Sequence, residues 1–220
     1  TVGNLQAAAT IKGAAGGTNN INLDRARLAP VIYEGGAGND LITAYNDKDN
    51  VIHLGEGDNR VDAAFGHQTI TAGSGNDRVT INGGYGTVDL GDGDNNFFAG
   101  PGDHHYTGGA GKDTVQVSSG ANVIDVGSGD DFVTVISFGG ASNTVFTSII
   151  GFGVGDKLTI VHAHSTAILS WFRMGGDTYV VLDNSGSNTF VAGIDAVVKL
   201  VGVTTLDLTG LTPSGDTLTF

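Results

Sequence analysis

The chain has 220 residues, of which 37 are glycine, 3 are proline and none is cysteine, and its formal net charge is -13. The lack of cysteine excludes disulfide bonds and cysteine-ligated zinc, and the excess of acidic residues disfavours nucleic acid as a partner, because phosphate recognition needs basic surfaces. No apolar run approaches the roughly 18 residues of a membrane span, and the first residues, TVGNLQAAATIKG, lack the features of an N-terminal secretory signal.

Residues 1–34 have the least regular pattern. GGTNNINL at 16–23 resembles a degenerate copy of the repeat that follows, and LDRARLAPVIY contains two of only five arginines. We expect this segment to form an N-terminal cap or degenerate first coils. A first residue of Thr is what removal of an initiator methionine would leave, which fits a complete protein, although a boundary within a longer chain would look the same.

From residue 35 the sequence repeats with a period of nine. The clear copies are GGAGNDLIT (35–43), LGEGDNRVD (54–62), AGSGNDRVT (72–80), LGDGDNNFF (90–98), AGPGDHHYT (99–107), GGAGKDTVQ (108–116) and VGSGDDFVT (126–134). Three units between them, at 63–71, 81–89 and 117–125, keep the length but lose most of the motif, and AYNDKDNVIH (44–53) has one extra residue.

One position of this repeat is apolar or aromatic in all eleven units, namely the eighth (the ninth in the longer unit): Ile42, Ile52, Val61, Ile70, Val79, Val88, Phe97, Tyr106, Val115, Ile124 and Val133. We interpret each unit as a Gly-rich turn followed by a three-residue strand whose middle residue points inward. One unit buries a single side chain and cannot fold alone, so the units must stack to close a core. Two units then make one coil of eighteen residues, with a turn at each edge.

Units of the form G-G-x-G-x-D-x-U-x, with U apolar, resemble the calcium-binding repeats of RTX proteins, and the resemblance covers residues 35–146. It implies an all-β fold, a right-handed parallel β-roll of nonapeptide repeats. It also implies that carbonyl groups of the turns and the sixth-position Asp hold Ca²⁺ between turns on the same edge. The chemistry is consistent, because Ca²⁺ takes six to eight oxygen ligands and glycine lets backbone carbonyls converge on an ion.

Six of these copies, whose turns we call the clear turns, begin at residues 35, 54, 72, 90, 108 and 126, a spacing that places all six on one edge of the roll. We expect about five calcium ions along this edge and few or none on the other, where AGPGDH is the best match but has His104 in place of Asp. The predicted side-chain ligands are Asp40, Asn59, Asp77, Asn95, Asp113 and Asp131, together with the turn acids Glu56 and Asp92. The turn residues predicted to contribute to the sites are Gly35, Ala37, Leu54, Gly55, Gly57, Ala72, Gly73, Ser74, Gly75, Leu90, Gly91, Gly93, Gly108, Gly109, Ala110, Gly111, Gly127 and Gly129.

Asn59 and Asn95 depart from the family pattern, because an amide oxygen is a weaker ligand and has no charge. Acids in the same turns, Glu56 and Asp58 in one and Asp92 and Asp94 in the other, either add charge near the ion or serve only solubility. Without calcium the acidic ladder repels itself, so we expect folding to depend on calcium. The alternative is a glycine-rich β-helix in which Asn and Asp only form turns, and the fixed position of the Asp disfavours it.

From residue 147 the period fails, and residues 147–220 are expected to form a β-rich C-terminal cap with a secretion signal. IIGFGVGDKLTI (149–160) resembles the segment that often follows RTX repeats, AILSWFRMGGDTYVVLD (167–183) predicts a hairpin, and AVVKLVGVTTLDL (196–208) predicts further strand. We expect Trp171 and Phe172 to belong to the core of this cap. The last residues, SGDTLTF, resemble the C-terminal signal of type I secretion, which implies export through that machinery and folding outside the cell.

The sequence contains no H-E-x-x-H zinc motif and no G-x-S-x-G elbow, and GGAGKDT lacks the Ser/Thr that a phosphate-binding loop has after Lys. The pairs His104-His105 and His162-x-His164 could bind a transition metal, but such two-histidine pairs are more often incidental. We therefore expect no enzyme but a secreted structural protein that self-associates on the cell surface, as in bacterial S-layers of similar composition. The alternatives are the C-terminal folding and secretion module of a larger enzyme or adhesin, and a module that binds cell-surface polysaccharide.

Overall fold

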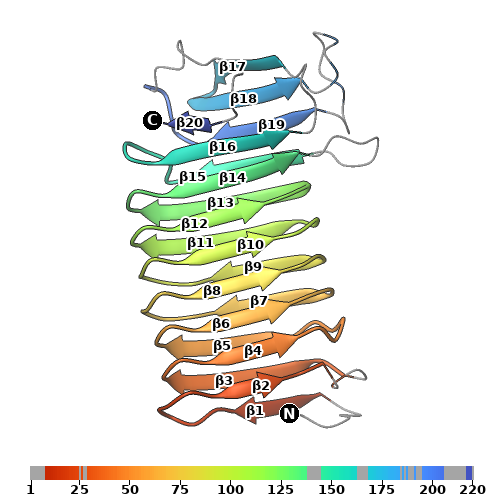
Figure 1. Cartoon of the computed structure of the whole chain (residues 1–220). Coiled ribbons are helices and arrows are strands. Elements are labelled where there is room, and N and C mark those ends of the chain that lie inside the picture. The colour runs from red at the N-terminus through yellow and green to blue at the C-terminus, as the bar shows by residue number, and fades with distance from the viewer. Residues whose placement is uncertain are drawn as a thin grey trace.

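The computed structural model describes residues 8–24, 26, 29–137, 145–162, 168–183, 185, 187, 191, 195–205 and 217–219, and these wind into a β-solenoid with two parallel sheets (Figure 1). The strands of the first sheet are β1 (Ala9–Lys12), β3 (Val31–Ala37), β5 (Val51–Glu56), β7 (His67–Thr71), β9 (Tyr85–Asp89), β11 (His104–Ala110), β13 (Gly120–Ser128) and β15 (Val145–Ile150). The strands of the second sheet are β2 (Asn20–Asn22), β4 (Leu41–Ala44), β6 (Arg60–Ala63), β8 (Arg78–Ile81), β10 (Asn96–Ala99), β12 (Thr114–Val117), β14 (Phe132–Ser137) and β16 (Lys157–His162).

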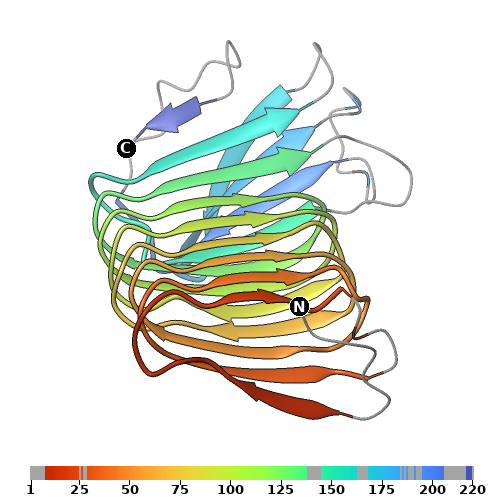
Figure 2. The same ribbon diagram turned by 60° about the horizontal axis from the view of Figure 1, so that its bottom comes forward.

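The pairing of the strands follows the period of the sequence. Val61 pairs with Val79 and Phe97 with Val115, eighteen residues apart, whereas Ile42 pairs with Val61 across the unit that carries the extra residue. Seen from its N-terminal end, the chain turns once per coil between the two facing sheets (Figure 2). The predicted all-β fold, a parallel β-roll, is confirmed.

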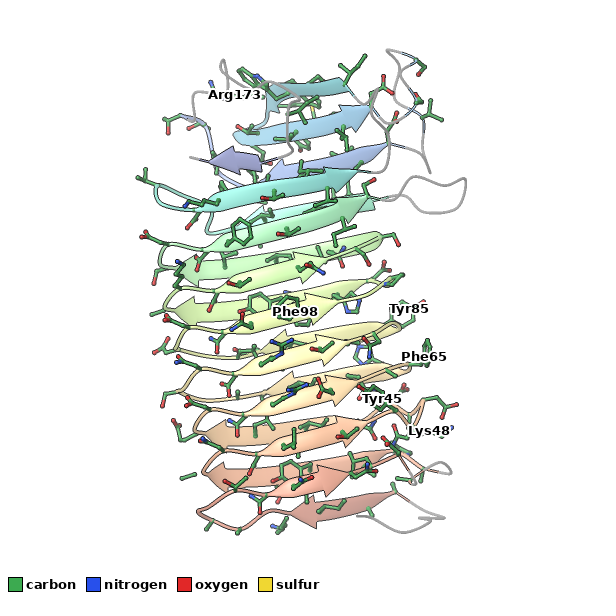
Figure 3. The ribbon with its side chains drawn as sticks, viewed as in Figure 1. Tyr45, Lys48, Phe65, Tyr85, Phe98 and Arg173 are labelled. Atoms are coloured by element: carbon green, nitrogen blue, oxygen red, sulfur yellow. The ribbon has the colours of Figure 1, made fainter. Side chains whose placement is uncertain are left out.

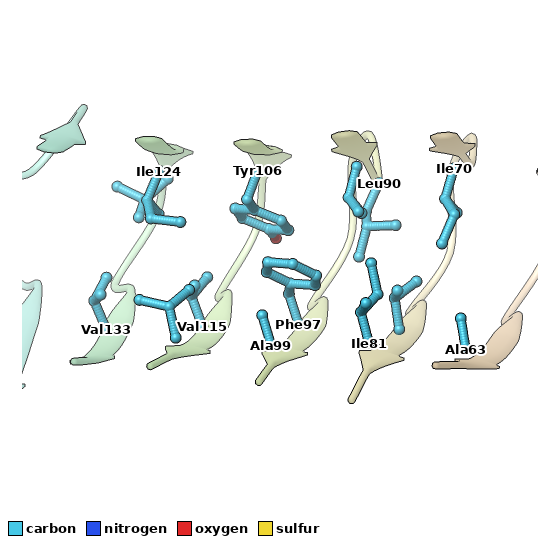
Figure 4. Close-up of a cluster of buried hydrophobic side chains, with 14 of the residues drawn as sticks. Ala63, Ile70, Ile81, Leu90, Phe97, Ala99, Tyr106, Val115, Ile124 and Val133 are labelled. Carbon is cyan, nitrogen blue, oxygen red and sulfur yellow. The ribbon is translucent and has the colours of Figure 1, made fainter. Parts of the chain in front are cut away.

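The core lies between the two sheets and contains the predicted inward column. All eleven residues at the eighth position of the units are at most 1% exposed. Across the core, the rings of Phe97 and Tyr106 stack with their centroids 5.1 Å apart (Figure 4). This contact packs the two sheets against each other through large buried side chains.

Each unit buries more than the single side chain that the sequence analysis assigned to it. The strands of the repeat region have at least four residues, and the first position of the following unit also points inward in most coils, as for Leu54, Leu90 and Val126, all 0% exposed. The prediction of a three-residue strand was therefore wrong. Side chains two positions apart share one face of a strand, so a longer strand contributes two of them to the core.

The stack continues beyond the repeats at both ends. At the N-terminus, β1 and β2 pair in parallel with β3 and β4, which confirms that GGTNNINL belongs to a degenerate coil. After the repeats, β15 pairs with β13 and β16 with β14, at a spacing of 25 residues, as in Gly120 with Val145. Residues 145–162 thus form one further coil after an insertion.

The C-terminal strands cover the open end of this coil. Strand β19 (Ala196–Leu200) pairs in parallel with β15, and β18 (Asp177–Asp183) and β17 (Ile168–Met174) extend the sheet as the predicted antiparallel hairpin. Strand β20 (Thr217–Thr219) pairs antiparallel with β16. The strands therefore cover both sheet edges of the last coil, as a cap must do.

The prediction that Phe172 belongs to the core of the cap was wrong. Its ring is 46% exposed and stacks on Tyr179, with centroids 5.0 Å apart, while the Arg173 guanidinium lies over the ring of Trp171. Most of SGDTLTF, and His164 of the second histidine pair, lie outside the described residues. In the part of the chain that the structure describes, no helix has the length and hydrophobicity that crossing a membrane would require.

Candidate calcium-binding edge

The six clear turns all lie on one edge of the solenoid, where the chain passes from the first sheet to the second. We call this the Asp edge, and it follows the left side of the stack in Figure 1. The structure brings together here all the turn residues predicted for the sites: Gly35, Ala37, Leu54, Gly55, Glu56, Gly57, Ala72, Gly73, Ser74, Gly75, Leu90, Gly91, Asp92, Gly93, Gly108, Gly109, Ala110, Gly111, Gly127 and Gly129.

The sixth residues of these turns form one continuous ladder of buried side chains. The residues are Asp40, Asn59, Asp77, Asn95, Asp113 and Asp131, each at most 2% exposed. In every coil the side-chain Oδ1 accepts the backbone N–H of the sixth residue in the preceding coil, for example Asp40 N to Asn59 Oδ1 at 2.8 Å and Asn95 N to Asp113 Oδ1 at 2.9 Å. Aspartate and asparagine can both accept this hydrogen bond, because each has a side-chain oxygen, Oδ1, at this position.

The second terminal atom of these side chains has three different environments. In the Asn turns it is an N–H donor: Asn59 Nδ2 donates to Gly57 O at 2.7 Å, and Asn95 Nδ2 donates to both Gly91 O and Gly93 O at 3.1 Å. Asp77 Oδ2 and Asp131 Oδ2 are buried and have no hydrogen-bond partner. A buried carboxylate oxygen without a partner is costly, so a cation at this point would stabilise the fold.

The remaining two carboxylates receive a tyrosine hydroxyl. Tyr33 Oη donates to Asp40 Oδ2 at 2.8 Å, and Tyr106 Oη donates to Asp113 Oδ2 at 3.1 Å. Both tyrosines occupy the inward position, and in both turns the residue two positions later is glycine, where a Cβ would meet the carboxylate. The shared pattern Y-x-G-G-A-G-x-D in the sequence could have identified this contact.

Burial changes the protonation of the ladder. Desolvation raises the pKa of Asp77 and of Asp131 to about 6, and it also raises the pKa of Asp113. The pKa of Tyr106 is raised as well, first by burial and then by the neighbouring Asp113. Without a counterion, these carboxylates therefore resist ionisation, as expected for a site that binds a cation.

Glycine is required where the turns stack. Gly91 and Gly93 have φ of 69° and 127°, and a Cβ on either would collide with the carbonyl oxygen of Gly73 or Gly75 in the preceding coil. The backbone carbonyls of neighbouring turns thus lie close together beside the buried carboxylates. Carbonyl and carboxylate oxygens are the ligands that a hard cation such as Ca²⁺ prefers, so the residues present fit this ion.

A comparison with protein families supports the same assignment. The model of the RTX calcium-binding nonapeptide repeat matches four copies, over residues 32–53, 46–79, 53–88 and 107–134. The chain is an RTX β-roll protein. RTX repeats bind calcium, and the chain therefore has a calcium-binding β-roll. A comparison with curated proteins gives no match to this chain.

The acids near Asn59 and Asn95 hold the RTX coils together through backbone groups. Glu56 Oε2 accepts the N–H of Ser74 at 3.0 Å, and Asp92 Oδ1 accepts the N–H of Ala110 at 2.9 Å, each in the next coil. The contact with Ser74 also lowers the pKa of Glu56. All four acids of these turns, Glu56, Asp58, Asp92 and Asp94, are exposed. Their side chains therefore bind the outer surface of the next turn.

Two members of the RTX ladder were missed by the sequence analysis. Asp156 Oδ1 accepts the N–H of Asp131 at 2.8 Å, and its Oδ2 accepts the N–H of Gly153 at 2.7 Å. At the other end, the backbone and side-chain nitrogens of Asn19 both donate to Asp40 Oδ1, at 3.1 and 2.6 Å. The signals were the run G-x-G-x-G-D at 151–156 and the degenerate copy GGTNNINL at 16–23, although neither residue lies in the nine-residue period.

The opposite edge, where the chain returns from the second sheet to the first, is closed by hydrogen-bond donors of the protein. Gln68 Nε2 donates to Lys48 O at 2.7 Å and to Phe65 O at 2.9 Å, and Asn122 Nδ2 donates to Ser118 O at 3.0 Å. His104 Nε2 lies 3.1 Å from Gly100 O, and burial lowers its pKa, so the neutral ring donates this hydrogen bond. These N–H groups occupy the turns of the RTX roll that lack the Asp.

The histidine pair on this edge does not converge on one point. His104 is 2% exposed and faces inward, whereas His105 follows it on the same strand and is exposed. Successive residues of a strand point to opposite faces, which separates the two rings. Among the described residues, no three His, Cys, Asp or Glu side chains cluster closely enough to hold a metal. Such a cluster consists of side chains alone, whereas the carbonyl oxygens of the stacked turns on the Asp edge are also suitable calcium ligands.

Proposed function

We propose that the protein is a secreted structural protein whose calcium-dependent β-roll folds outside the cell and assembles on the cell surface. RTX repeat proteins are typically secreted. The observation that carries the proposal is the ladder itself, in which the buried, unpartnered oxygens of Asp77 and Asp131 would make folding more favourable where a cation is available. Type I secretion machinery fits this scheme, because it exports chains that have not yet folded.

A row of exposed aromatic side chains supports assembly. Tyr45, Phe65 and Tyr85 lie in successive coils on the opposite edge and are 48%, 63% and 55% exposed (Figure 3). Exposed apolar side chains that gather along one edge often mark a contact with another molecule. A second copy of the chain presents the same row, so two rows can bury each other.

Electron microscopy of the purified protein with calcium and with chelator tests this proposal. We expect ordered sheets or filaments only with calcium. The double variant Phe65→Ser/Tyr85→Ser should stay monomeric in calcium and keep its far-UV circular dichroism, because both side chains are exposed and no core contact is lost. Monodisperse wild-type monomers in both conditions would contradict assembly.

A groove on the second sheet supports one other function, the binding of a cell-surface polysaccharide. It has a volume of about 470 Å³ and is lined by Phe98 together with polar side chains of neighbouring coils, Thr80, Asn82, Gln116 and Ser119. The Arg78 guanidinium lies 4.9 Å from the centroid of the Phe98 ring. An aromatic ring flanked by hydroxyl and amide groups suits a sugar. Retention of the protein on cell-wall polysaccharide, lost in Phe98→Ala, would favour this function over assembly alone.

A further inference from the structure

The sixth side chains of the Asn and Asp turns of the RTX ladder differ in one terminal atom, and the structure holds the other terminal atom, Oδ1, in the same way in both. Oδ1 accepts the same backbone N–H in each case, at 2.8 Å for Asn59 and at 2.9 Å for Asn95. Asp77 and Asp131 use Oδ1 identically, at 2.8 Å. With one oxygen fixed by this contact, the other terminal atom, Nδ2 or Oδ2, is directed to equivalent points of the turn.

In the Asn turns, the turn carbonyls already receive hydrogen bonds from the side-chain amide. The Nδ2 of Asn95 donates its two hydrogens to the carbonyls of Gly91 and Gly93, and that of Asn59 donates to Gly57 O. In an Asp turn the same place holds a carboxylate oxygen, which carries negative charge and cannot donate. Oxygen atoms that face one another without a hydrogen between them need a cation, whereas an amide N–H supplies the positive partner itself.

We propose that the side-chain amides of Asn59 and Asn95 replace calcium in their own turns. Calcium then binds in the turns whose sixth residue is Asp, most tightly at Asp77 and Asp131. This inference rests on calcium binding by the RTX repeats and not on assembly at a surface. If each ion between two turns takes the carboxylate oxygen of one sixth-position Asp, the expected number of ions falls from about five to at most four, because the six turns contain four such Asp residues.

The order of affinity follows from the partners of each carboxylate. Asp77 Oδ2 and Asp131 Oδ2 have no hydrogen-bond partner, and Asp113 Oδ2 accepts one hydrogen bond from the Tyr106 hydroxyl. Both oxygens of Asp40 accept hydrogen bonds, from Tyr33 and from Asn19. A carboxylate with existing partners gains less from an ion, since part of its hydrogen-bonding capacity is already used. We therefore expect Asp40 to bind calcium most weakly.

Isothermal titration calorimetry and native mass spectrometry with calcium alone test the proposal by counting bound ions. The variants Asn59→Asp and Asn95→Asp should each bind one ion more than the wild type. The matched control is Asn76→Asp, which adds the same charge at the exposed fifth position of a turn, where Asn76 Oδ1 accepts the N–H of Asp94 at 2.8 Å. This control should leave the count unchanged.

The reciprocal variant Asp77→Asn should bind one ion fewer and should fold at a lower calcium concentration than the wild type. A wild-type count of five or more, an unchanged count in Asn95→Asp, or an equal gain in Asn76→Asp would overturn the inference. A wild-type chain that binds no calcium would contradict the calcium-dependent function as well. The two failures are therefore distinguishable.

Discussion

The replacement of Asp131 by Asn should change the free energy of unfolding in opposite directions without calcium and with calcium. In the wild type, Oδ1 accepts the N–H of Asp113 at 2.8 Å, while Oδ2 is buried without a partner. The Asn variant keeps the first contact and places Nδ2 toward the carbonyls of Gly127 and Gly129, as Asn95 does in its own turn. Without calcium the variant should therefore be more stable, and with saturating calcium it should be less stable.

The size of both effects can be worked from these contacts. A buried acceptor without a partner costs about 1–3 kcal/mol, and each hydrogen bond gained contributes about 1 kcal/mol. We expect a calcium-free gain of about 2–3 kcal/mol, roughly a 30- to 140-fold change in the folding equilibrium. With calcium at about 1,000 times its Kd, loss of one ion removes about 4.1 kcal/mol, which exceeds this gain.

Urea unfolding followed by far-UV circular dichroism, in chelator and in saturating calcium, measures both values. Sucrose at equal concentration in all samples keeps the calcium-free chain folded enough to be measured. Asp130→Asn is the control, because Asp130 is the exposed neighbour in the same turn and its loss removes the same charge. A similar gain in Asp130→Asn, or a loss of stability in calcium-free Asp131→Asn, would refute the reasoning.

Three further changes probe other contacts of the fold. Tyr106→Phe leaves Asp113 Oδ2 without its hydrogen-bond donor. Urea unfolding should show that the free energy of unfolding falls by about 1–3 kcal/mol in chelator and by less in calcium, and equal losses would contradict this. Phe97→Ala should lose about 3–5 kcal/mol in saturating calcium, because the ring is fully buried and stacks on Tyr106, and a loss below about 1 kcal/mol would not fit. Burial lowers the pKa of His104 below its usual 6.5, so below about pH 6.5 the unfolded wild type takes up a proton that the folded ring resists. The free energy of unfolding of the wild type therefore falls as the pH decreases, and His104→Gln should reduce this fall. Urea midpoints of both proteins at pH 7 and pH 5 measure the difference, and parallel profiles would rule out a role of this ring.

The period of the sequence predicted the inward column because burial of one apolar side chain per strand needs only a fixed spacing. The same alternation also predicts a second inward residue two positions later. Leu54, Leu90 and Val126 were assigned to the turns instead, because they begin the Gly-rich motif, yet their side chains are fully buried. One residue can serve both roles, since its carbonyl belongs to the turn and its side chain to the core.

The coils outside the period could not be predicted in the same way. Asn20 pairs with Leu41, and Phe132 pairs with Lys157, 25 residues on, so the connecting segments differ in length from those of the repeats. A few extra residues in a surface connection cost little free energy, because the entropy of loop closure grows slowly with length. Strand pairing and buried side chains therefore persist where the nine-residue spacing has changed.

The different environments of the ladder required the structure. The sequence analysis treated the amide of Asn95 as a weak ligand because it considered only the oxygen, whereas the nitrogen makes the decisive contacts with Gly91 and Gly93. Likewise, the hydroxyl of Tyr106 reaches Asp113 only because Gly108 leaves space between them. Such contacts depend on the orientation of side chains, which a pattern of residue types does not specify.

The ladder also has a consequence for how such a molecule changes its length in evolution. Each coil needs only the coil after it, whose sixth residue accepts its N–H, and the last acceptor, Asp156, turns its second oxygen back to Gly153 within its own loop. The ends of the ladder are therefore formed by residues of the two terminal coils, Asn19 at the start and Asp156 at the end. Duplication or deletion of eighteen residues between them preserves the N–H to Oδ1 contact that joins each coil to the next, so the chain can lengthen or shorten by whole coils with this contact intact.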